Sequence, residues 1–551
     1  SSNFWVASGP IGPAGACYQE HQSIDRALSP GCFNGGMIIE NIQLVWFKRD
    51  LRIADHRPLA EAARRGPVLP VYVVEPGYWR QPDTAARHQA FIAESLADLH
   101  QALTELGQGL VIEIGELPEV FERLRDRFGF VAIHAHEETG TDWTFARDRR
   151  VRAWCREKGV ALHEYPQFGV QRGLKDRDGW AKRWEAFMGE DPVAAPQSLP
   201  FVVETPAPDD VFAAAAPYDR RETPDRQRGG LVEGQATLAD FLDERGEAYR
   251  GGISSPLSAE TACSRLSAHI AYGTVSLRSI LQANRQRMVQ AREAGEKRWR
   301  GSLYQFDQRL HWHCHFIQKL EQRPELEWRN MHPGFDGMRE DDFDAERFAA
   351  WAEGRTGYPL VDACMRFLTH SGWLNFRMRA LLMSFAGYQL WLHWRQPSLH
   401  LARLFTDYEP GIHYCQCQMQ NGVTGINTLR IYNPVKQAQD QDPDGEFVRR
   451  WVPELAGVPT EAIFEPWKLG RFERRSCGAL DYPEPIVDHI EASRAARRAI
   501  GEYRKRPGFR KEADRVQREL GSRRSGLLPS GRRKKAKKKK ADAASRQGVL
   551  F

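Results

Sequence analysis

Two hydrophobic patterns divide the chain. Between Ile42 and about residue 170, short runs rich in valine and isoleucine alternate with segments in which apolar residues recur at helical spacing. Short buried strands separated by helices of about 10 to 15 residues are typical of βαβ units. We therefore expect a doubly wound α/β domain with a mainly parallel sheet over residues 37–170.

The second pattern is helical throughout. From Leu238 onward the strand-like runs disappear, and glycine or proline marks the helix ends. This pattern predicts an all-α domain over residues 236–505. Residues 171–235 show little periodicity and contain the segment PFVVETPAPDD, so we interpret them as a linker.

The two ends of the chain differ from its middle. Residues 1–36 are rich in glycine, serine and proline, without the features of a secretory signal. We interpret them as a disordered or non-native extension, with Met37 as a candidate natural start. Residues 504–551 contain 18 Lys or Arg against 4 Asp or Glu. We expect a disordered basic tail over 506–551 that binds nucleic acid phosphates; a solvated tail without a partner is the alternative.

Composition narrows the class of protein. Hydrophobic residues make up 41% and charged residues 27% of the chain, and no apolar run reaches the roughly 20 residues of a membrane span. Nine cysteines without a CxxC motif predict free thiols in a reducing compartment. We expect a cytoplasmic monomer, with an iron–sulfur cluster on Cys415, Cys417 and Cys477 as a weaker alternative.

Histidines at every second position do not form a metal site here. His311, His313 and His315 lie in a segment of helical pattern, where neighbours in such a set point about 200° apart. The three side chains cannot share one ion. We therefore expect no metal.

An arginine in an apolar run marks the first candidate site. Arg379 lies within a helical, mostly apolar segment, and Asp407 and Glu409 follow where that segment ends. A buried cation needs an anionic partner to offset desolvation, and Asp407 is the simplest one. Because Trp373 and Trp394 frame the segment, we expect a place for a large flat polar ring system. A structural ion pair among core aromatics is the alternative.

Other segments predict further binding walls. Ser264 and Ser267 lie at a predicted helix start, where hydroxyls and free N–H groups favour an anion such as a pyrophosphate; ordinary capping is the alternative. In doubly wound sheets, ligands lie beyond the carboxyl ends of the strands, which makes residues 46–52 and 134–141 candidate walls. No GxGxxG follows the first strand, which argues against an ordinary dinucleotide site.

Five motifs together resemble the photolyase and cryptochrome family. In order, they are LVWFKRDLR, CSRLSAHIAYG, EGRTGYPLVDACMRFLTHSGWLNFRMR, RIYNPVKQAQDQDPDGEFVRRWVPEL and DYPEPIVDH. The resemblance covers about residues 40–500 and implies an α/β antenna domain followed by a helical domain that binds folded FAD. It implies a DNA photolyase, a carbon–carbon lyase that uses blue light and reduced FAD to repair pyrimidine lesions in UV-damaged DNA. The alternative is a cryptochrome-type photoreceptor that signals without repair.

The resemblance also assigns roles to single residues. Arg379 and Asp407 match the pair that flanks the flavin ring, and Trp394 matches the middle of a tryptophan chain that carries electrons to it. Trp391, Tyr414 and Tyr388 are further candidate relays. The implied FAD contacts are Tyr249, Ser264, Arg265, Leu266, Ser267, Phe306, Trp373, Arg379, Asp407, Glu409 and His413.

Several positions depart from the family pattern. In the lesion pocket, Trp312 matches a lesion-stacking tryptophan, whereas Arg309 stands where a glutamate is expected and Met419 where a second tryptophan is expected. Near the flavin, His413 stands where an asparagine is expected and Cys417 where the first tryptophan of the electron chain is expected. The candidate catalytic residues are therefore Arg309, Trp312, His413 and Met419. The missing pocket residues favour the receptor, whereas Trp312, the Arg379 and Asp407 pair and the basic tail favour repair.

Two consequences follow for the chromophores. His413 could donate a proton or a hydrogen bond to the flavin; a neutral, hydrogen-bonded imidazole is the alternative. Pro82, Trp143 and Thr144 stand where folate-binding residues are expected. We do not expect a folate antenna, and a deazaflavin, another chromophore or none remain as alternatives.

Overall fold

The computed structural model describes residues 39–522. The predicted N-terminal extension and the lysine-rich end of the tail lie outside the described residues. From Glu40 onward the described residues belong to one compact unit. Within 39–522, no helix combines the length and apolar character needed to cross a membrane.

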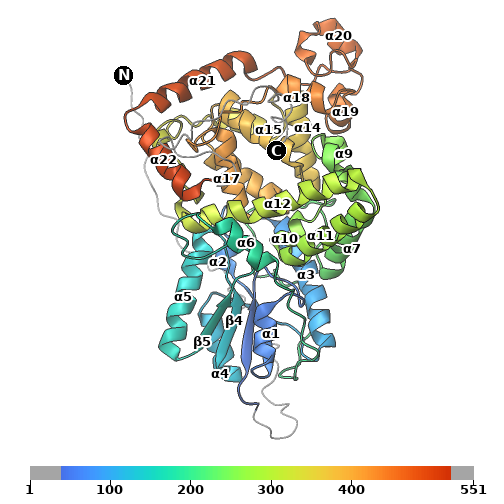
Figure 1. Cartoon of the computed structure of the whole chain (residues 1–551). Helices are drawn as coiled ribbons and strands as arrows, with labels where there is room; N and C mark the ends of the chain where they lie inside the picture. Colours follow the sequence, from blue (N-terminus) through green and yellow to red (C-terminus); the bar gives the residue numbers. More distant parts are fainter. Residues whose placement is uncertain (1–38, 523–551) are drawn as a thin grey trace, which may run out of the picture. The chain divides into compact units, whose positions relative to one another are not determined.

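A five-stranded parallel sheet forms the first part of the described chain (Figure 1). Its strands are ordered β3-β2-β1-β4-β5, with β1 in the centre. Helices connect successive strands, as the alternating pattern predicts, and the doubly wound α/β fold is confirmed. The elements are β1 (Gln43–Phe47), α1 (Arg57–Ala63), β2 (Val68–Val74), α2 (Pro76–Trp79), α3 (Ala86–Glu105), β3 (Val111–Ile114), α4 (Glu119–Phe128), β4 (Ala132–His136), α5 (Asp142–Lys158) and β5 (Ala161–Tyr165).

The remainder of the described chain is helical, as predicted. Its longest helix, α12, has 26 residues and packs against α11 and α17. Helix α15 continues into a π-helical turn at Phe385–Gln389, a feature that often marks functional sites. The main helices are α7 (Leu231–Asp243), α9 (Pro256–Ala262), α10 (Ser267–Ala271), α11 (Leu277–Glu293), α12 (Lys297–Gln322), α13 (Ala345–Ala352), α14 (Pro359–Ser371), α15 (Phe376–Ser384), α16 (Arg395–Leu404), α17 (Pro410–Asn421), α18 (Pro434–Gln441), α19 (Glu446–Trp451), α20 (Arg471–Ser476) and α21 (His489–Lys505).

Two helices lie where the sequence predicts none. Helix α6 (Trp180–Met188) falls inside the predicted linker, and its Trp180 and Trp184 rings pack edge-on against His311 of α12. Helix α22 (Phe509–Leu520) falls inside the predicted disordered tail and buries Val516 and Leu520. The prediction of disorder from residue 506 is therefore wrong for α22, because a few apolar residues at helical spacing outweigh its high charge.

Candidate functional site

A cavity of about 300 Å³ opens between α12, α15, α17 and the segment before α10. Most of the predicted cofactor residues line it: Tyr249, Ser264, Arg265, Ser267, Phe306, Trp373, Arg379, Asp407, Glu409 and His413. Leu266 is not part of this lining and packs in a hydrophobic cluster instead. Of the predicted catalytic residues, Arg309 and His413 line the cavity, whereas Trp312 and Met419 lie outside its lining.

Arg379 and Asp407 form a two-point ion pair in the cavity wall. The Nη1 to Oδ1 distance is 3.0 Å and the Nη2 to Oδ2 distance is 2.7 Å. Burial alone would raise the pKa of Asp407, but the charge and hydrogen bonds of Arg379 outweigh it and hold that pKa below its usual value. The predicted pairing is confirmed. The Arg379 guanidinium also lies over the Phe405 ring, 4.0 Å from the ring centre.

A second arginine is placed to meet an anion. The Arg265 guanidinium lies 4.0 Å from the centre of the Trp373 ring, and it forms no salt bridge within residues 39–522. Its backbone has a φ of 60°, a conformation that costs a residue of this type about 1 to 3 kcal/mol and often marks a binding site. Burial lowers the pKa of Arg265 to about 10, so it remains charged at neutral pH.

The two serines lie beside this arginine. Ser267 is the first residue of α10, which has only five residues, and its hydroxyl is one of the groups that lower the pKa of Asp407. So short a helix contributes little dipole, and the predicted helix-start effect is not supported. The serine hydroxyls and the Arg265 guanidinium are the groups that can bind an anion here.

His413 is a neutral imidazole. Its Nε2 donates to the carbonyl of Ser398 over 2.8 Å, and burial lowers its pKa to about 4. With the proton on Nε2, the other ring nitrogen is an acceptor. The structure thus agrees with the hydrogen-bonded alternative, and His413 in this state has no proton to give from Nδ1.

One face of α17 supplies further lining residues, of which Gln416 and Gln420 were not predicted from the sequence, whereas Cys417 was expected near the flavin. Gln416, Cys417 and Gln420 follow His413 at intervals of three, four and seven residues and line the same cavity. Met419 follows His413 by six residues and therefore lies on another face. On α12, His313 follows Arg309 by four residues and also lines the cavity. Helical spacing from the predicted residues was the signal that could have found them.

The predicted electron relays lie behind this wall. Trp394 is fully buried, donates from Nε1 to Asn330 Oδ1 over 2.8 Å, and has its ring centre 6.3 Å from that of Tyr414. Trp391 lies apart from this contact, with Arg339 over its ring at 4.2 Å. Cys417 gives the cavity wall no aromatic ring at its position.

The loop that carries Asp407 is held by side chains from the α/β region. The contacts are Arg87 Nη1 to the Leu404 carbonyl (2.7 Å), His88 Nε2 to the Phe405 carbonyl (2.9 Å), Arg49 Nη2 to the Tyr408 carbonyl (2.7 Å), Asp83 Oδ2 to the Tyr408 hydroxyl (2.6 Å) and Arg49 to Glu409 (3.3 Å). Glu409 of the helical region therefore forms an ion pair with Arg49, which follows β1 in the α/β region. We call residues 404–409 the flavin loop.

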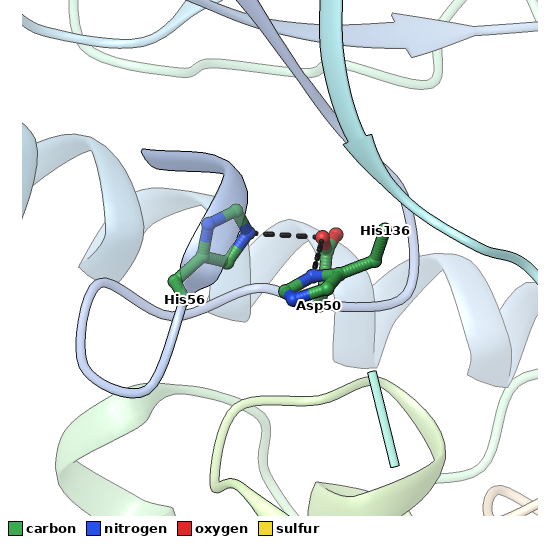
Figure 2. A group of neighbouring side chains, drawn as sticks. All are labelled: Asp50, His56 and His136. Carbon is green, nitrogen blue, oxygen red and sulfur yellow. Dashed lines mark hydrogen bonds and ion pairs between the residues drawn. The ribbon is translucent and has the colours of Figure 1, made fainter. Parts of the chain in front are cut away.

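The carboxyl ends of β1 and β4 meet as the sequence predicts. Residues from 46–52 and 134–141 line a small hollow together with Ala271 and Glu409. In its wall, Asp50 Oδ2 accepts hydrogen bonds from His56 Nε2 (2.9 Å) and His136 Nδ1 (2.7 Å), as Figure 2 shows. Burial alone would raise the pKa of Asp50, but the two imidazoles hold it well below its usual range.

This buried trio is a hydrogen-bonded group, and its two imidazoles and one carboxylate are also close enough together to hold an ion. His56 Nδ1 accepts from the Leu59 amide over 3.1 Å, so its Nε2 carries the proton that Asp50 receives. Burial also lowers the pKa of His136 to about 3. Within 39–522 this is the one group of three such side chains close enough to hold an ion, so Cys415, Cys417 and Cys477 are not gathered for a cluster.

Comparisons with known proteins decide the family. A family model described as the FAD binding domain of DNA photolyase matches residues 306–502, and one described as DNA photolyase matches residues 43–168. A deoxyribodipyrimidine photo-lyase from Streptomyces griseus is 33% identical over 481 residues, 84% of this chain and 99% of the relative. This chain belongs to the photolyase and cryptochrome family.

This chain is similar both to relatives named as cryptochromes and to relatives named as photolyases. A cryptochrome DASH from Gloeobacter violaceus is 30% identical over 487 residues, 83% of this chain and 95% of the relative. The crystal structure of a bacterial class III photolyase from Agrobacterium tumefaciens aligns with a TM-score of 0.73 at 26% identity, covering 86% of this chain and all of that one. The family and the two-part fold expected from the sequence are confirmed.

FAD is the cofactor of the family's helical domain, and the cavity fits it. Arg265, which has no ion-pair partner within 39–522, is a cation suited to a pyrophosphate, and Arg379 with Asp407 offers a flat polar wall for a ring system. Apolar side chains such as Met383 and Leu401 complete the lining. The residues present thus supply an anion site, a ring site and an apolar wall in one cavity.

Proposed function

We propose that this protein is a DNA photolyase that repairs UV-induced pyrimidine lesions with light. The observation that carries the proposal is the bidentate Arg379 and Asp407 pair in an FAD-binding cavity of a chain that matches a deoxyribodipyrimidine photo-lyase over 84% of its length. Bound FAD, when reduced and excited by light, supplies one electron that splits the lesion. The side chains of this protein bind, orient and desolvate the reactants.

Four polar residues of the cavity lining favour a polar ligand. Arg309, His313, Gln416 and Gln420 face the cavity, and Gln416 Oε1 is buried without a hydrogen-bond partner among the described residues. Side-chain amides can bind the exposed edge of a pyrimidine that has left the duplex, an event that costs a few kcal/mol and least for a damaged base. We propose that these residues, rather than Trp312 and Met419, contact the lesion directly.

A lesion-specific repair assay tests the function. Full-length protein with chemically reduced FAD is mixed with duplexes that carry one cyclobutane dimer or one 6-4 product, in blue light and in darkness. We expect one lesion to disappear in light only, as measured by chromatography of the digested DNA. Persistence of both lesions, with the flavin verified as reduced, would reject repair.

The receptor is the second candidate. Its support is the similarity to cryptochrome DASH relatives together with Cys417 and Met419 at positions where the resemblance implies tryptophans. A receptor would change its shape or partner surface on flavin photoreduction without removing either lesion. The same assay therefore separates the two functions.

We further propose that the basic tail helps to hold DNA. The run of Lys and Arg after Gly531 lies outside the described residues, so its sequence alone supports this role. Deleting residues 532–551 should weaken DNA binding, and the loss should be largest at low salt. The slope of log affinity against log salt concentration should become less steep by about 0.7 to 0.9 for each phosphate that the protein no longer neutralises. Fluorescence anisotropy at several salt concentrations measures this slope, and an unchanged slope would assign the tail no role.

A further inference from the structure

Tyr408 connects the cavity with a buried carboxylate of the α/β region. Its ring lines the cavity, and its hydroxyl lies 2.6 Å from Asp83 Oδ2 and 3.2 Å from the Tyr414 hydroxyl. A phenol has a single proton, so Tyr408 donates to Asp83 and accepts from Tyr414. All three side chains are buried, which leaves this chain of hydrogen bonds closed to bulk water.

The position of these rings suits electron transfer to the cavity. Cys417 leaves the α17 wall without an aromatic side chain there, while the Tyr408 and Tyr414 rings lie 5.3 and 5.5 Å from that of His413, which also lines the cavity. Tyr414 in turn contacts the buried Trp394 ring. Of the two tyrosines that line the cavity, Tyr249 and Tyr408, it is Tyr408 whose hydroxyl is hydrogen-bonded to a carboxylate, and Tyr414 lies behind it.

Asp83 prevents a buried positive charge from forming when Tyr408 is oxidised. A tyrosine that loses an electron in an apolar site would become an unpaired buried cation, which costs several kcal/mol. Transfer of its proton to Asp83 leaves both groups neutral. Burial raises the pKa of Asp83 against the opposing hydrogen bond from Tyr408, which makes this carboxylate a better proton acceptor than an exposed one.

We propose that Tyr408 is an electron donor to light-excited oxidised flavin in this cavity and that Asp83 accepts its proton. One electron leaves Tyr408 for the flavin, and the O–H proton moves to the Asp83 carboxylate, giving a neutral tyrosyl radical and a carboxylic acid. Tyr414 then passes one electron and its own O–H proton to Tyr408 along their existing hydrogen bond, which moves the radical to Tyr414. A thiol in solution, which cannot reach the buried Tyr414 ring, then supplies one electron through the protein and releases its own proton to solvent. The proton on Asp83 returns along the hydrogen bonds and restores both phenols. The proposal rests on FAD as cofactor, but not on lesion repair.

Two variants and one control test the relay in the FAD-loaded full chain. Tyr408→Phe removes the phenol, and Asp83→Asn keeps a hydrogen-bond acceptor but cannot take the proton. We expect the rate of flavin photoreduction with added thiol to fall by about 100-fold or more in each, because a positioned proton-transfer group typically contributes about 10²- to 10⁴-fold. Tyr272→Phe removes another buried phenol near Arg49 and should reduce its flavin at the wild-type rate.

Two further measurements, a solvent isotope effect and a radical spectrum, test the relay independently of the comparison between variants. In deuterated water, photoreduction of the wild type should slow, and this isotope effect should be absent in Asp83→Asn. Electron paramagnetic resonance on chains with deuterated tyrosine should show a neutral tyrosyl radical in the wild type and in Tyr414→Phe. In Tyr414→Phe the radical should persist on Tyr408.

Wild-type photoreduction rates in both variants, or a tryptophan radical without an isotope effect, would overturn the relay. If Tyr408→Phe loses its flavin, the relay can still be tested with Asp83→Asn and with the radical of the wild type, because Asp83 does not line the cavity. Repair by chemically reduced protein needs no relay. If chemically reduced protein repairs no lesion but a tyrosyl radical forms in light, the photolyase function is rejected and the relay is kept. If the lesion is repaired but no tyrosyl radical forms, only the relay is rejected.

Discussion

Asp407→Asn should purify with less than a tenth of the wild-type flavin. The substitution removes the negative partner of Arg379, whose side chain is only 26% exposed, and leaves its charge unpaired in the cavity wall. Breaking a buried pair from one side costs about 3 kcal/mol, and about 1.4 kcal/mol corresponds to a tenfold change in an equilibrium constant. Absorbance of the desalted protein gives the flavin content per chain.

A matched pair elsewhere separates flavin loss from general destabilisation. Arg278 and Asp55 form a similarly buried pair at 3.1 Å that takes no part in the cavity lining. Asp55→Asn should lower the free energy of unfolding while flavin content stays at one per chain. Full flavin content in Asp407→Asn would contradict the assigned role of the pair.

The same pair gives stability a defined pH dependence. The folded pKa of Asp407 is below its ordinary value, so its contribution is fully present above the unfolded carboxyl pKa of about 3.9. That contribution is lost as the pH falls through the lower folded pKa. The difference in unfolding free energy between wild type and Asp407→Asn should therefore shrink below about pH 4, as denaturant titrations at several pH values would show.

Arg49→Met is expected to weaken flavin binding without touching the cavity. Arg49 donates to the carbonyls of Ala271 and Tyr408 and pairs with Glu409, whereas its own side chain is outside the lining. Methionine keeps much of the length but leaves Glu409 as a buried carboxylate without its cation, at a cost of about 3 kcal/mol. The flavin loop should loosen, and the FAD dissociation constant should rise at least about tenfold.

Arg52→Met is the control for this prediction. Arg52 is more deeply buried than Arg49 and donates to the carbonyls of Gly273 and Asp55, so it joins the two regions away from the flavin loop. We expect a loss of stability with unchanged FAD affinity, measured by fluorescence titration. Equal effects of both variants on FAD affinity would show that general destabilisation, rather than the loop, controls binding.

The sequence predicted what depends on local pattern and on charge balance. Alternation of short apolar strands with helices identified the sheet, since β1, β2 and β4 are buried on both faces. The need of a buried cation for a partner identified Asp407 as the counter-ion of Arg379, and the distance between them confirms it. Both predictions rest on physical requirements that hold for any arrangement of the remaining chain.

The rest depended on tertiary packing. Charged residues conceal the apolar spacing of α6 and α22, whose helices form because Trp184 and Leu520 find partners elsewhere in the fold. The position of Met419 follows from the rotation of α17, which faces Gln416 and Gln420 into the cavity instead. The link between Asp83 and Tyr408 joins residues more than three hundred positions apart, and no local pattern announces such a contact.

The flavin loop has a consequence for how the two regions of this protein can change. Because Arg49, Asp83, Arg87 and His88 fix the backbone and side chains next to Asp407, the α/β region is a structural part of the photochemical centre. A helical region expressed alone, or joined to a foreign α/β module, would lose that support. Any exchange of the α/β region must therefore carry these four side chains with it, or the helical region ceases to hold its own cofactor.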